Sequence, residues 1–206
     1  MENSLFIVDD HGIVRYGLKD WLESNSHWKV RKTFSNSADC MAELNKLGKK
    51  SPELPEIIII DIQLLGETGF NLCNQITKSF NTIKCIMYSM YNTSGYVLQA
   101  MENGAKGYIS KIASEQELLK CLETVKNGNV YLEENMKTSQ IKLVDVIQGF
   151  TKQEKTIFEA LLQGKTNEQI SDELFISIRT VNNYISRIYD KVNVKNRQEL
   201  MEQYGS

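Results

Sequence analysis

The 206-residue sequence predicts a doubly wound, five-stranded parallel α/β sheet followed by a small all-helical domain. Strand-like and helix-like segments alternate five times in the first part of the chain, which is typical of a parallel sheet wrapped by helices. The run Ile57-Ile58-Ile59-Ile60 is apolar without alternation, as expected of a strand buried on both faces. Beyond Val130 no convincing strand follows, and the remaining pattern is one of short helices.

The individual elements follow from hydrophobic periodicity. Apolar residues spaced three and four apart predict helices, whereas apolar runs or strict alternation predict strands. The expected strands are 5–8, 28–34, 57–60, 83–88 and 107–109, and the expected helices are 12–25, 38–47, 69–79, 94–103 and 115–126. Pro52 and Pro55, the only two prolines, mark the loop before the isoleucine strand.

The change of pattern predicts two domains and a connector. The three expected parts are 1–128, the sheet domain; 129–149, a polar connector with a short helix around Ile141–Ile147; and 150–206, the helical domain. The connector lacks the Gly/Ser bias of a loose tether.

Composition excludes several classes of protein. A net charge of -2 gives no bulk signal for nucleic acid or membrane, and no apolar run reaches the ~20 residues of a membrane span. The first residues carry no signal-peptide pattern, so we expect a cytoplasmic protein. Free core thiols are expected of the four widely spaced cysteines, Cys40, Cys73, Cys85 and Cys121. Only two histidines are present, which argues against a zinc site or a histidine-based triad.

Polar side chains follow four of the predicted strands at the point where each strand ends. Asp9 and Asp10 follow the first strand, and Asp61 follows the isoleucine strand. Ser89 and Lys111 follow two later strands. Ligands collect at the carboxyl ends of strands in open α/β sheets. A single aspartate there is more simply a turn cap, but three carboxylates at one edge need a cation to neutralise them.

These five residues suit phosphoryl transfer to an aspartate. A carboxylate can act as a nucleophile toward phosphorus, and neighbouring acids can hold Mg²⁺, which prefers oxygen ligands. A lysine and a hydroxyl could then stabilise the phosphoryl oxygens. Taken alone, Ser89 is simply a strand-end serine and Lys111 a solvated lysine. The position of all five residues at the ends of four strands favours a functional site.

Residues 1–128 resemble the receiver domain of two-component response regulators, which has a flavodoxin-like fold. The matching residues are Val8-Asp9-Asp10-His11, Asp61, Gly69, Ser89, Gly104-Ala105-Lys106-Gly107-Tyr108 and Lys111. The resemblance implies that a partner sensor histidine kinase phosphorylates Asp61. It also implies a Mg²⁺ cofactor held by Asp9, Asp10, Asp61 and the Gln63 carbonyl, and a phosphoryl-sensing set formed by Ser89, Tyr108 and Lys111.

The chain departs from the receiver pattern at three places. Leu64-Leu65 stands where the family usually has Met-Pro, Gly12 stands where a proline often follows the histidine, and Ile112 replaces the proline after Lys111. None of these departures removes a chemical group from the site.

The segment from Phe150 onward resembles the LuxR-type helix-turn-helix of NarL/FixJ regulators. The matching residues are Thr151-Lys152-Gln153-Glu154, Gly164-Lys165-Thr166-Asn167-Glu168-Gln169-Ile170, Ile176-Ser177-Ile178-Arg179-Thr180-Val181, Ile188 and Lys191-Val192. Thr151 and Glu154 also have the spacing of a capping box, which explains a helix start without any function.

The expected recognition helix has one apolar stripe, formed by Val181, Ile185, Ile188 and Val192. The resemblance implies that its polar residues contact promoter DNA: Arg179, Thr180, Asn182, Asn183, Ser186, Arg187 and Lys191. Asparagine can read adenine bidentately, and arginine can read guanine or hold phosphate. The simple alternative is a solvated polar face. The family commonly dimerises on DNA through the last helix, so a homodimer is expected when the protein is phosphorylated.

The function predicted from these observations is that of a response regulator transcription factor, not an enzyme. One alternative is a transcription factor that works without phosphorylation and uses the receiver as a dimerisation module. A second is an aspartyl-phosphate phosphatase or mutase, but such enzymes carry a second aspartate as general acid where this chain has Gln63.

Overall fold

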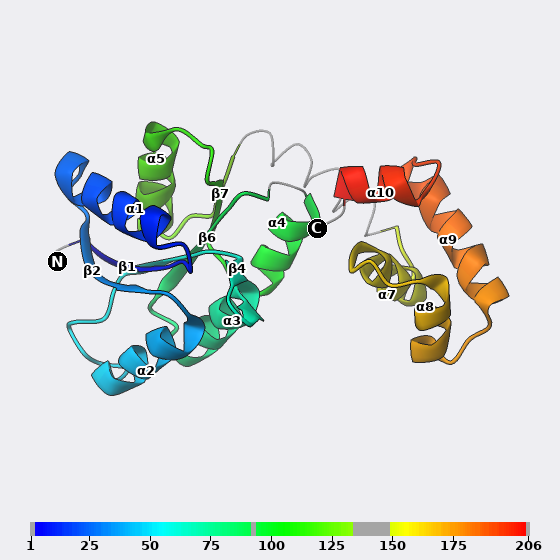
Figure 1. Ribbon diagram of the computed structural model, residues 1–206, viewed down its shortest axis with the longest axis horizontal. Coiled ribbons are helices and arrows are strands. Elements are labelled where there is room, and N and C mark those ends of the chain that lie inside the picture. The colour runs from blue at the N-terminus through cyan, green and yellow to red at the C-terminus, as the bar shows by residue number, and fades with distance from the viewer. Residues whose placement is uncertain (1–2, 92–93, 134–148, 205–206) are drawn as a thin grey trace. The chain divides into compact units, whose positions relative to one another are not determined.

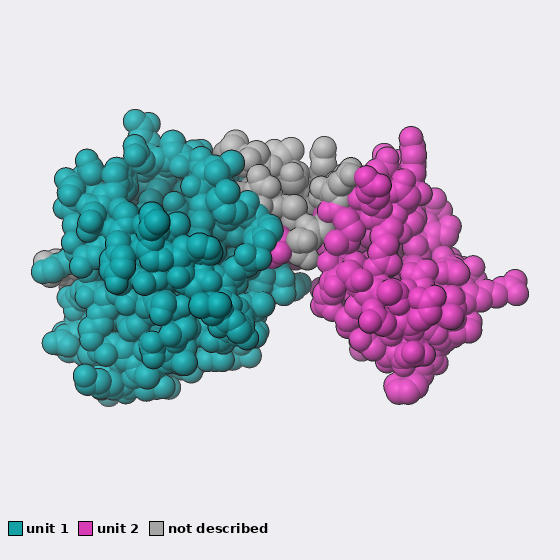
Figure 2. Space-filling view, viewed as in Figure 1, with its two compact units in different colours: residues 1–92, 99–133 teal, residues 93–98, 134–206 magenta. Residues whose placement is uncertain are grey.

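A computed structural model of the protein describes residues 3–91, 94–133 and 149–204 (Figure 1). Two compact units are formed, one by residues 1–92 with 99–133 and the other by 93–98 with 134–206 (Figure 2). The short helix predicted around Ile141–Ile147 lies outside the described residues, and the predicted limits of the connector stay predictions.

The first unit is built on a parallel sheet, which confirms the predicted doubly wound α/β class. Its strand order is β2-β1-β3-β6-β7-β8, and every pairing is parallel. The strands are β1 (Ser4–Val8), β2 (Lys29–Phe34), β3 (Ile57–Ile60), β6 (Lys84–Ser89), β7 (Gly107–Ser110) and β8 (Tyr131–Leu132). From β1 the chain first adds β2 on one side and then crosses to β3 on the other, so the strand order reverses between β1 and β3.

The sheet has six strands where the sequence predicted five. The expectation that no strand follows Val130 was wrong, because Tyr131–Leu132 pairs with β7. A two-residue strand is too short to show periodicity, so only its pairing reveals it. The same reason hid β4 (Gln63–Leu64) and β5 (Glu67–Thr68), which form a small antiparallel hairpin directly after Asp61.

Helices cover both faces of this sheet. They are α1 (Gly12–Asn25), α2 (Ser37–Leu47), α3 (Gly69–Ser79) and α5 (Glu115–Lys126). A further helix, α4 (Ser94–Glu102), is divided between the two units after residue 98. Figure 1 shows α1 and α5 on one side of the sheet and α2 and α3 on the other. Ile57 and Ile59 belong to the core beneath α1 and α5, so by strand alternation Ile58 and Ile60 face the opposite layer. This two-sided burial explains the unbroken isoleucine run, and each buried side chain contributes roughly 1.5–3 kcal/mol.

The four cysteines are buried free thiols, as predicted. Among the helices of the described residues, none has both the length and the apolarity that a membrane span needs.

The second unit contains the predicted helix-turn-helix. Its helices are α7 (Lys152–Leu162), α8 (Asn167–Leu174), α9 (Ile178–Val192) and α10 (Arg197–Tyr204). The predicted stripe of Val181, Ile185, Ile188 and Val192 is buried in its core, together with Ile157, Leu161 and Ile170 from α7 and α8. Phe175 ends α8 in the left-handed conformation (φ 54°), which turns the chain toward α9.

Glu154 joins the start of α7 to the end of α9. Its carboxylate accepts a hydrogen bond from the Thr151 backbone N–H (2.7 Å), which completes a capping box, and it pairs with Lys191 Nζ at 2.8 Å. The hydrogen bond from Lys191, aided by the one from Thr151, lowers the pKa of Glu154 from 4.5 to about 2. The ionised carboxylate therefore stabilises the folded unit.

Replacing Glu154 by Gln should destabilise the helical unit at neutral pH. Glutamine also closes a capping box, so the substitution removes the charge and keeps the cap. Since Lys191 is partly exposed, we expect a loss on the order of 1 kcal/mol. A carboxylate whose pKa is lowered by folding stabilises the folded state at pH values above its ordinary pKa. The difference in unfolding free energy between wild type and variant should therefore shrink as pH falls from about 4.5 toward 2.

Urea unfolding of the full chain, followed through the NMR signals of α9 amides, measures this effect. The exposed Asp172→Asn substitution on α8 is the control and should leave the unfolding midpoint almost unchanged. A Glu154→Gln difference that stayed constant down to pH 2.5 would contradict the electrostatic explanation.

Candidate functional site

The three predicted carboxylates meet where the strand order reverses. Asp9 and Asp10 follow β1, and Asp61 follows the adjacent strand β3. A backbone hydrogen bond from Asp61 N to Val8 O (2.8 Å) holds the two strand ends together. One ligand atom each from Asp9, Asp10, His11 and Asp61 lies within 4.8 Å of all the others. Ligands bind at such a reversal point in open α/β sheets, so this edge is the candidate site.

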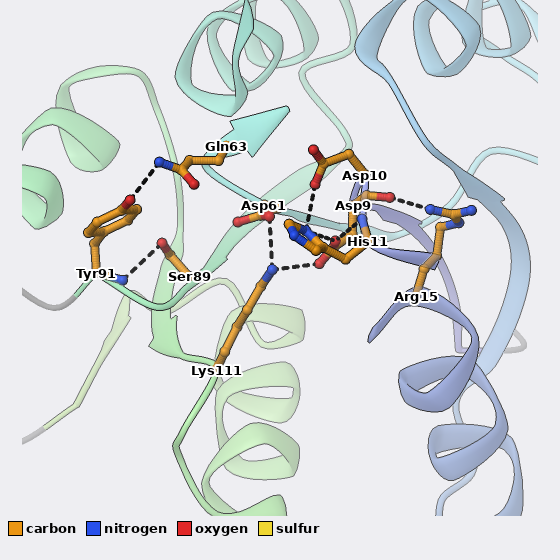
Figure 3. A network of polar contacts seen from close by, with 9 residues as sticks. All are labelled: Asp9, Asp10, His11, Arg15, Asp61, Gln63, Ser89, Tyr91 and Lys111. Carbon is orange, nitrogen blue, oxygen red and sulfur yellow. Dashed lines mark hydrogen bonds and ion pairs between the residues drawn. The ribbon is translucent and has the colours of Figure 1, made fainter. Parts of the chain in front are cut away.

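Lys111 joins the carboxylates from the other side of β3. Its ammonium lies 2.7 Å from Asp9 Oδ2 and 2.8 Å from Asp61 Oδ2 (Figure 3). The Lys111 backbone N–H donates to Ser89 O at 2.8 Å, which fixes the base of the lysine against β6. The exposed fractions of the Lys111, Asp9 and Asp61 side chains are 9%, 3% and 5%, so these ion pairs are shielded from water.

Burial and charge act in opposite directions on this cluster. Burial raises the pKa of Asp61, and the hydrogen bond and charge of Lys111 only partly oppose it, so the pKa stays above its ordinary value. Burial alone would lower the pKa of Lys111, but its hydrogen bonds to Asp61 and Asp9 outweigh that effect and raise it. The lysine is therefore a permanent cation beside a carboxylate that is costly to keep ionised.

Asp10 has a buried oxygen with unmet hydrogen-bonding capacity. Its Oδ1 accepts no hydrogen bond in the described structure, although His11 Nδ1 lies 2.7 Å away and would be a cation when protonated. Asp9 Oδ1, by contrast, accepts from the His11 backbone N–H at 2.8 Å. Converging carboxylate oxygens, one of them buried without a hydrogen bond, fit a hard cation such as Mg²⁺.

Tyr91 connects three predicted site residues to one another. Its N–H donates to Ser89 Oγ (3.2 Å), its carbonyl accepts from the Tyr108 hydroxyl (2.6 Å), and its hydroxyl lies 2.5 Å from Gln63 Nε2 (Figure 3 shows the first and the last). Ser89 and Tyr108 are buried, with the Tyr108 ring already inside the unit. Sequence reasoning missed Tyr91, because it lies in a loop beyond the strand end and no periodic pattern marks it.

The loop after Asp61 has its own structure. Leu64 is buried and Leu65 is 77% exposed, while Gly66 turns the β4–β5 hairpin at φ 83°. Gly69 then starts α3 against the strand end, where an added Cβ would lie 1.9 Å from the Asp61 carbonyl oxygen. Only glycine fits there, which accounts for Gly69 in the receiver pattern.

The predicted DNA-contacting residues lie on α9, on the side away from its buried stripe. Arg179, Asn182, Asn183, Ser186 and Arg187 are exposed. Thr180 is half-buried, with its hydroxyl 2.8 Å from Ser177 Oγ. The Lys191 ammonium binds Glu154 and the Gly149 carbonyl, so this lysine already has a role within the domain.

Known proteins resemble this chain in both units. Residues 5–123 match the response regulator receiver domain, and residues 148–203 match the luxR family of bacterial regulatory proteins. Oxygen regulatory protein NreC of Staphylococcus carnosus is 28% identical over 96% of this chain and 94% of its own length. The DNA-binding transcriptional activator DevR/DosR of Mycobacterium tuberculosis is 28% identical over 95% of this chain and 90% of its own.

Solved structures show the same fold. RcsB, a two-component response regulator solved as a complex with DNA, matches with a TM-score of 0.73 at 22% identity, over 98% of each chain. ChrA, the response regulator of a heme-sensing two-component system, matches with a TM-score of 0.55 at 26% identity, over 98% of this chain and 96% of its own.

Replacing Asp61 by Asn should stabilise the first unit at neutral pH. An acid whose pKa is raised by folding destabilises the fold once it ionises. The gain in unfolding free energy should therefore be absent below about pH 3.8, the ordinary pKa of the carboxyl. It should appear as pH rises through that value and become constant above the raised pKa of the folded state. We expect a gain of about 1 kcal/mol, the usual scale of single substitutions.

Urea unfolding followed by tryptophan fluorescence measures this gain, because both tryptophans, Trp21 and Trp28, lie in this unit. Asp20→Asn, which removes an exposed carboxylate from α1, is the control. A loss of stability in Asp61→Asn at pH 7 would show that the pair with Lys111 outweighs burial.

Proposed function

Since the chain belongs to the response regulators, with a receiver domain followed by a LuxR-type DNA-binding domain, we propose that phosphorylation of Asp61 controls its binding to promoter DNA. It is a two-component transcription regulator, not an aspartyl-phosphate enzyme. The observation that carries the proposal is the buried Asp61 carboxylate beside Lys111 and the acidic pair. Because promoter DNA lies in the bacterial cytoplasm, we also propose that the protein is cytoplasmic.

The phosphoryl donor is a phosphohistidine of a partner sensor kinase. An Asp61 oxygen attacks phosphorus, the P–N bond breaks, and the imidazole nitrogen keeps the bonding electrons and takes up a proton. The Lys111 ammonium, 2.8 Å from Asp61 Oδ2, stabilises the charge on the transferred group. Asp9, Asp10, Asp61 and the Gln63 carbonyl would hold Mg²⁺, which neutralises the carboxylates and binds phosphoryl oxygen when present.

The phosphoryl group is sensed through Ser89, Lys111 and Tyr108. It adds about 1.5–2 negative charges and three acceptor oxygens, which compete for the Lys111 ammonium and attract the Ser89 hydroxyl. Ser89 Oγ now accepts from Tyr91 N–H, and the Tyr91 carbonyl holds the Tyr108 hydroxyl. Moving Ser89 therefore alters the contacts of Tyr91 and, through them, those of Tyr108. The group shifts the equilibrium only by its differential affinity for the two states.

The DNA-binding domain acts as a homodimer on promoter DNA. DevR/DosR is described as a DNA-binding activator, and a structure of RcsB contains two dimers bound to two DNAs. On α9, the exposed Arg179, Asn182, Asn183, Ser186 and Arg187 form the recognition surface, flanked by Thr180 and Lys191. Direct contacts to bases and phosphates from this helix fit the major groove.

One observation favours the second candidate, a regulator that works without phosphorylation. Tyr108 is fully buried with its hydroxyl bonded. The resemblance to receiver domains implies that this ring turns inward on phosphorylation, and here it is inward without a phosphoryl group. In that case the receiver dimerises without a phosphoryl group, and adding Mg²⁺ with beryllofluoride leaves the fraction of dimer unchanged. The two candidates therefore differ in a single measurable response.

Acetyl phosphate with Mg²⁺ should convert the wild-type protein to dimers, because it phosphorylates Asp61. Asp61→Asn should abolish the response, since its amide cannot accept the group. Asp10→Asn should raise the Mg²⁺ concentration required at least about tenfold, because it removes a metal ligand. Light scattering coupled to size-exclusion chromatography measures the dimers, and Asp20→Asn should behave as wild type. Unchanged dimerisation in Asp61→Asn would exclude the phosphorylation switch and support the second candidate.

Replacing Arg187 by Ala should weaken DNA binding and flatten its salt dependence. Each lost phosphate contact lowers the slope of log K against log salt by about 1, so a dimer should lose about 2. Fluorescence anisotropy at several salt concentrations gives the slope. Lys120→Ala, which removes an exposed charge from α5, should leave it unchanged. The assignment of Arg187 fails if both variants keep the wild-type slope and affinity.

A further inference from the structure

Three polar side chains form a hydrogen-bonded row from α10 through α8 to α9, which we name the amide relay. Arg197 Nη1 donates to Asn167 Oδ1 at 3.5 Å, and Asn167 Nδ2 donates to Asn182 Oδ1 at 2.8 Å. Arg197 Nη2 also donates to the Lys165 carbonyl. The relay therefore ends at an exposed residue of the recognition helix.

The chemistry of Arg197 determines the direction of every bond in the relay. A guanidinium has only donors, so the Asn167 atom that faces it must be the oxygen. The amide nitrogen of Asn167 then faces Asn182, where only an oxygen can accept. Turning either amide alone by 180° would bring two donors or two acceptors together between Asn167 and Asn182, and turning both would set the Asn167 nitrogen against the Arg197 guanidinium, so the network favours the orientation found.

The first two members of the relay sit on helix ends held by other contacts. Asn167 is the first residue of α8, directly after the Thr166 N-cap, whose capping box with Gln169 is complete. Arg197 is the first residue of α10 and is half-buried, and the Asn196 side chain before it accepts from Glu199 N at 2.9 Å. Both groups are thus in place before any DNA is bound.

We propose that the amide relay makes Asn182 a donor-only contact that selects guanine at its position in the operator. This rests on the proposed DNA-binding function. Reading adenine needs both the oxygen and the nitrogen of an asparagine amide on the DNA side, and the hydrogen bond from Asn167 turns the Asn182 oxygen toward α8 and leaves the nitrogen on the other side. The remaining amide hydrogens suit the N7 and O6 acceptors of guanine. Asn167 is then a specificity-determining residue that reaches the base through Asn182.

The neighbouring Asn183 provides an internal comparison. Its side chain is exposed, and no side-chain hydrogen bond to it is found among the described residues. It keeps both halves of its amide for DNA. Two adjacent asparagines on α9 should therefore differ in base preference, because only one of them has its orientation set.

Asn167→Asp reverses the direction of the relay and is the decisive variant. A carboxylate at position 167 only accepts, so it turns the Asn182 amide around and leaves its oxygen facing the DNA. The same carboxylate pairs with Arg197, which supports the fold. An outward oxygen selects a donor edge, adenine N6 or cytosine N4. A general weakening by the added negative charge acts on all sequences alike and leaves the ratio between bases unaffected.

The experiment is binding-site selection on random DNA with the full-length protein and beryllofluoride, followed by anisotropy on the selected operator. Asn182→Ala identifies the base pair that Asn182 reads, because preference is lost at that position alone. There, wild type should prefer guanine over adenine about tenfold, and Asn167→Asp should reverse the order. Replacing that guanine by 7-deazaguanine should remove most of the wild-type preference.

Two control variants separate orientation from structure. Asn167→Ala frees the Asn182 amide to turn, so the guanine preference should fall and adenine become acceptable. Asn183→Ala should change a neighbouring position only. Thermal unfolding of each variant checks that the helical domain stays folded. A guanine preference retained in Asn167→Asp, or a wild-type preference for adenine, would overturn the proposal.

A second readout tests the relay without DNA. In the full-length protein, the side-chain NH₂ signals of Asn182 should shift in Asn167→Asp, where this group becomes the donor. Unchanged signals would also overturn the proposal. If wild type selects no DNA sequence but these signals shift, the DNA-binding function fails while the relay itself stands.

Discussion

The ion pairs of Lys111 with Asp9 and Asp61 are the constraint on which the receiver site depends. They place one buried cation between the ends of β1 and β3, at distances of 2.7 and 2.8 Å. Buried carboxylates are costly unless they are paired with a cation, and Lys111 is the cation that both of these carboxylates share. Burial raises the pKa of Asp61, and the hydrogen bond and charge of Lys111 partly oppose that rise. In the proposed function, the residue that destabilises the fold when it ionises is also the one that accepts the phosphoryl group.

Tyr91 links the residues around this site to one another. It uses its N–H for Ser89 and its carbonyl for Tyr108, so two backbone atoms of one loop residue touch both predicted sensing residues. Its hydroxyl lies against Gln63 on the hairpin after Asp61. Tyr91 therefore connects the end of β6, the strand β7 and the hairpin after Asp61.

The DNA-binding domain uses polar contacts in a comparable way. The Lys191 ammonium lies 2.8 Å from the Glu154 carboxylate and joins the start of α7 to the end of α9. The charge of this lysine is therefore partly neutralised within the domain. Asn167 likewise donates a hydrogen bond to the side-chain oxygen of Asn182 and so orients that amide. Side chains that a helical wheel presents as equivalent polar positions thus differ in what they can offer to a base or a phosphate.

Local pattern in the sequence determined the doubly wound class, the buried isoleucine strand, the apolar stripe of α9, and the strand ends that carry Asp9, Asp10 and Asp61. Each rests on periodicity or on strand-end position, and both are properties of short segments. Only the tertiary structure decided the strand β8, the part played by Tyr91, and the orientation of Asn182. Tyr91 and Gln63 are 28 positions apart, and Asn167 and Asn182 are 15. Hydrogen bonds between such residues leave no periodic trace, because they depend on where the packed helices and strands place two side chains.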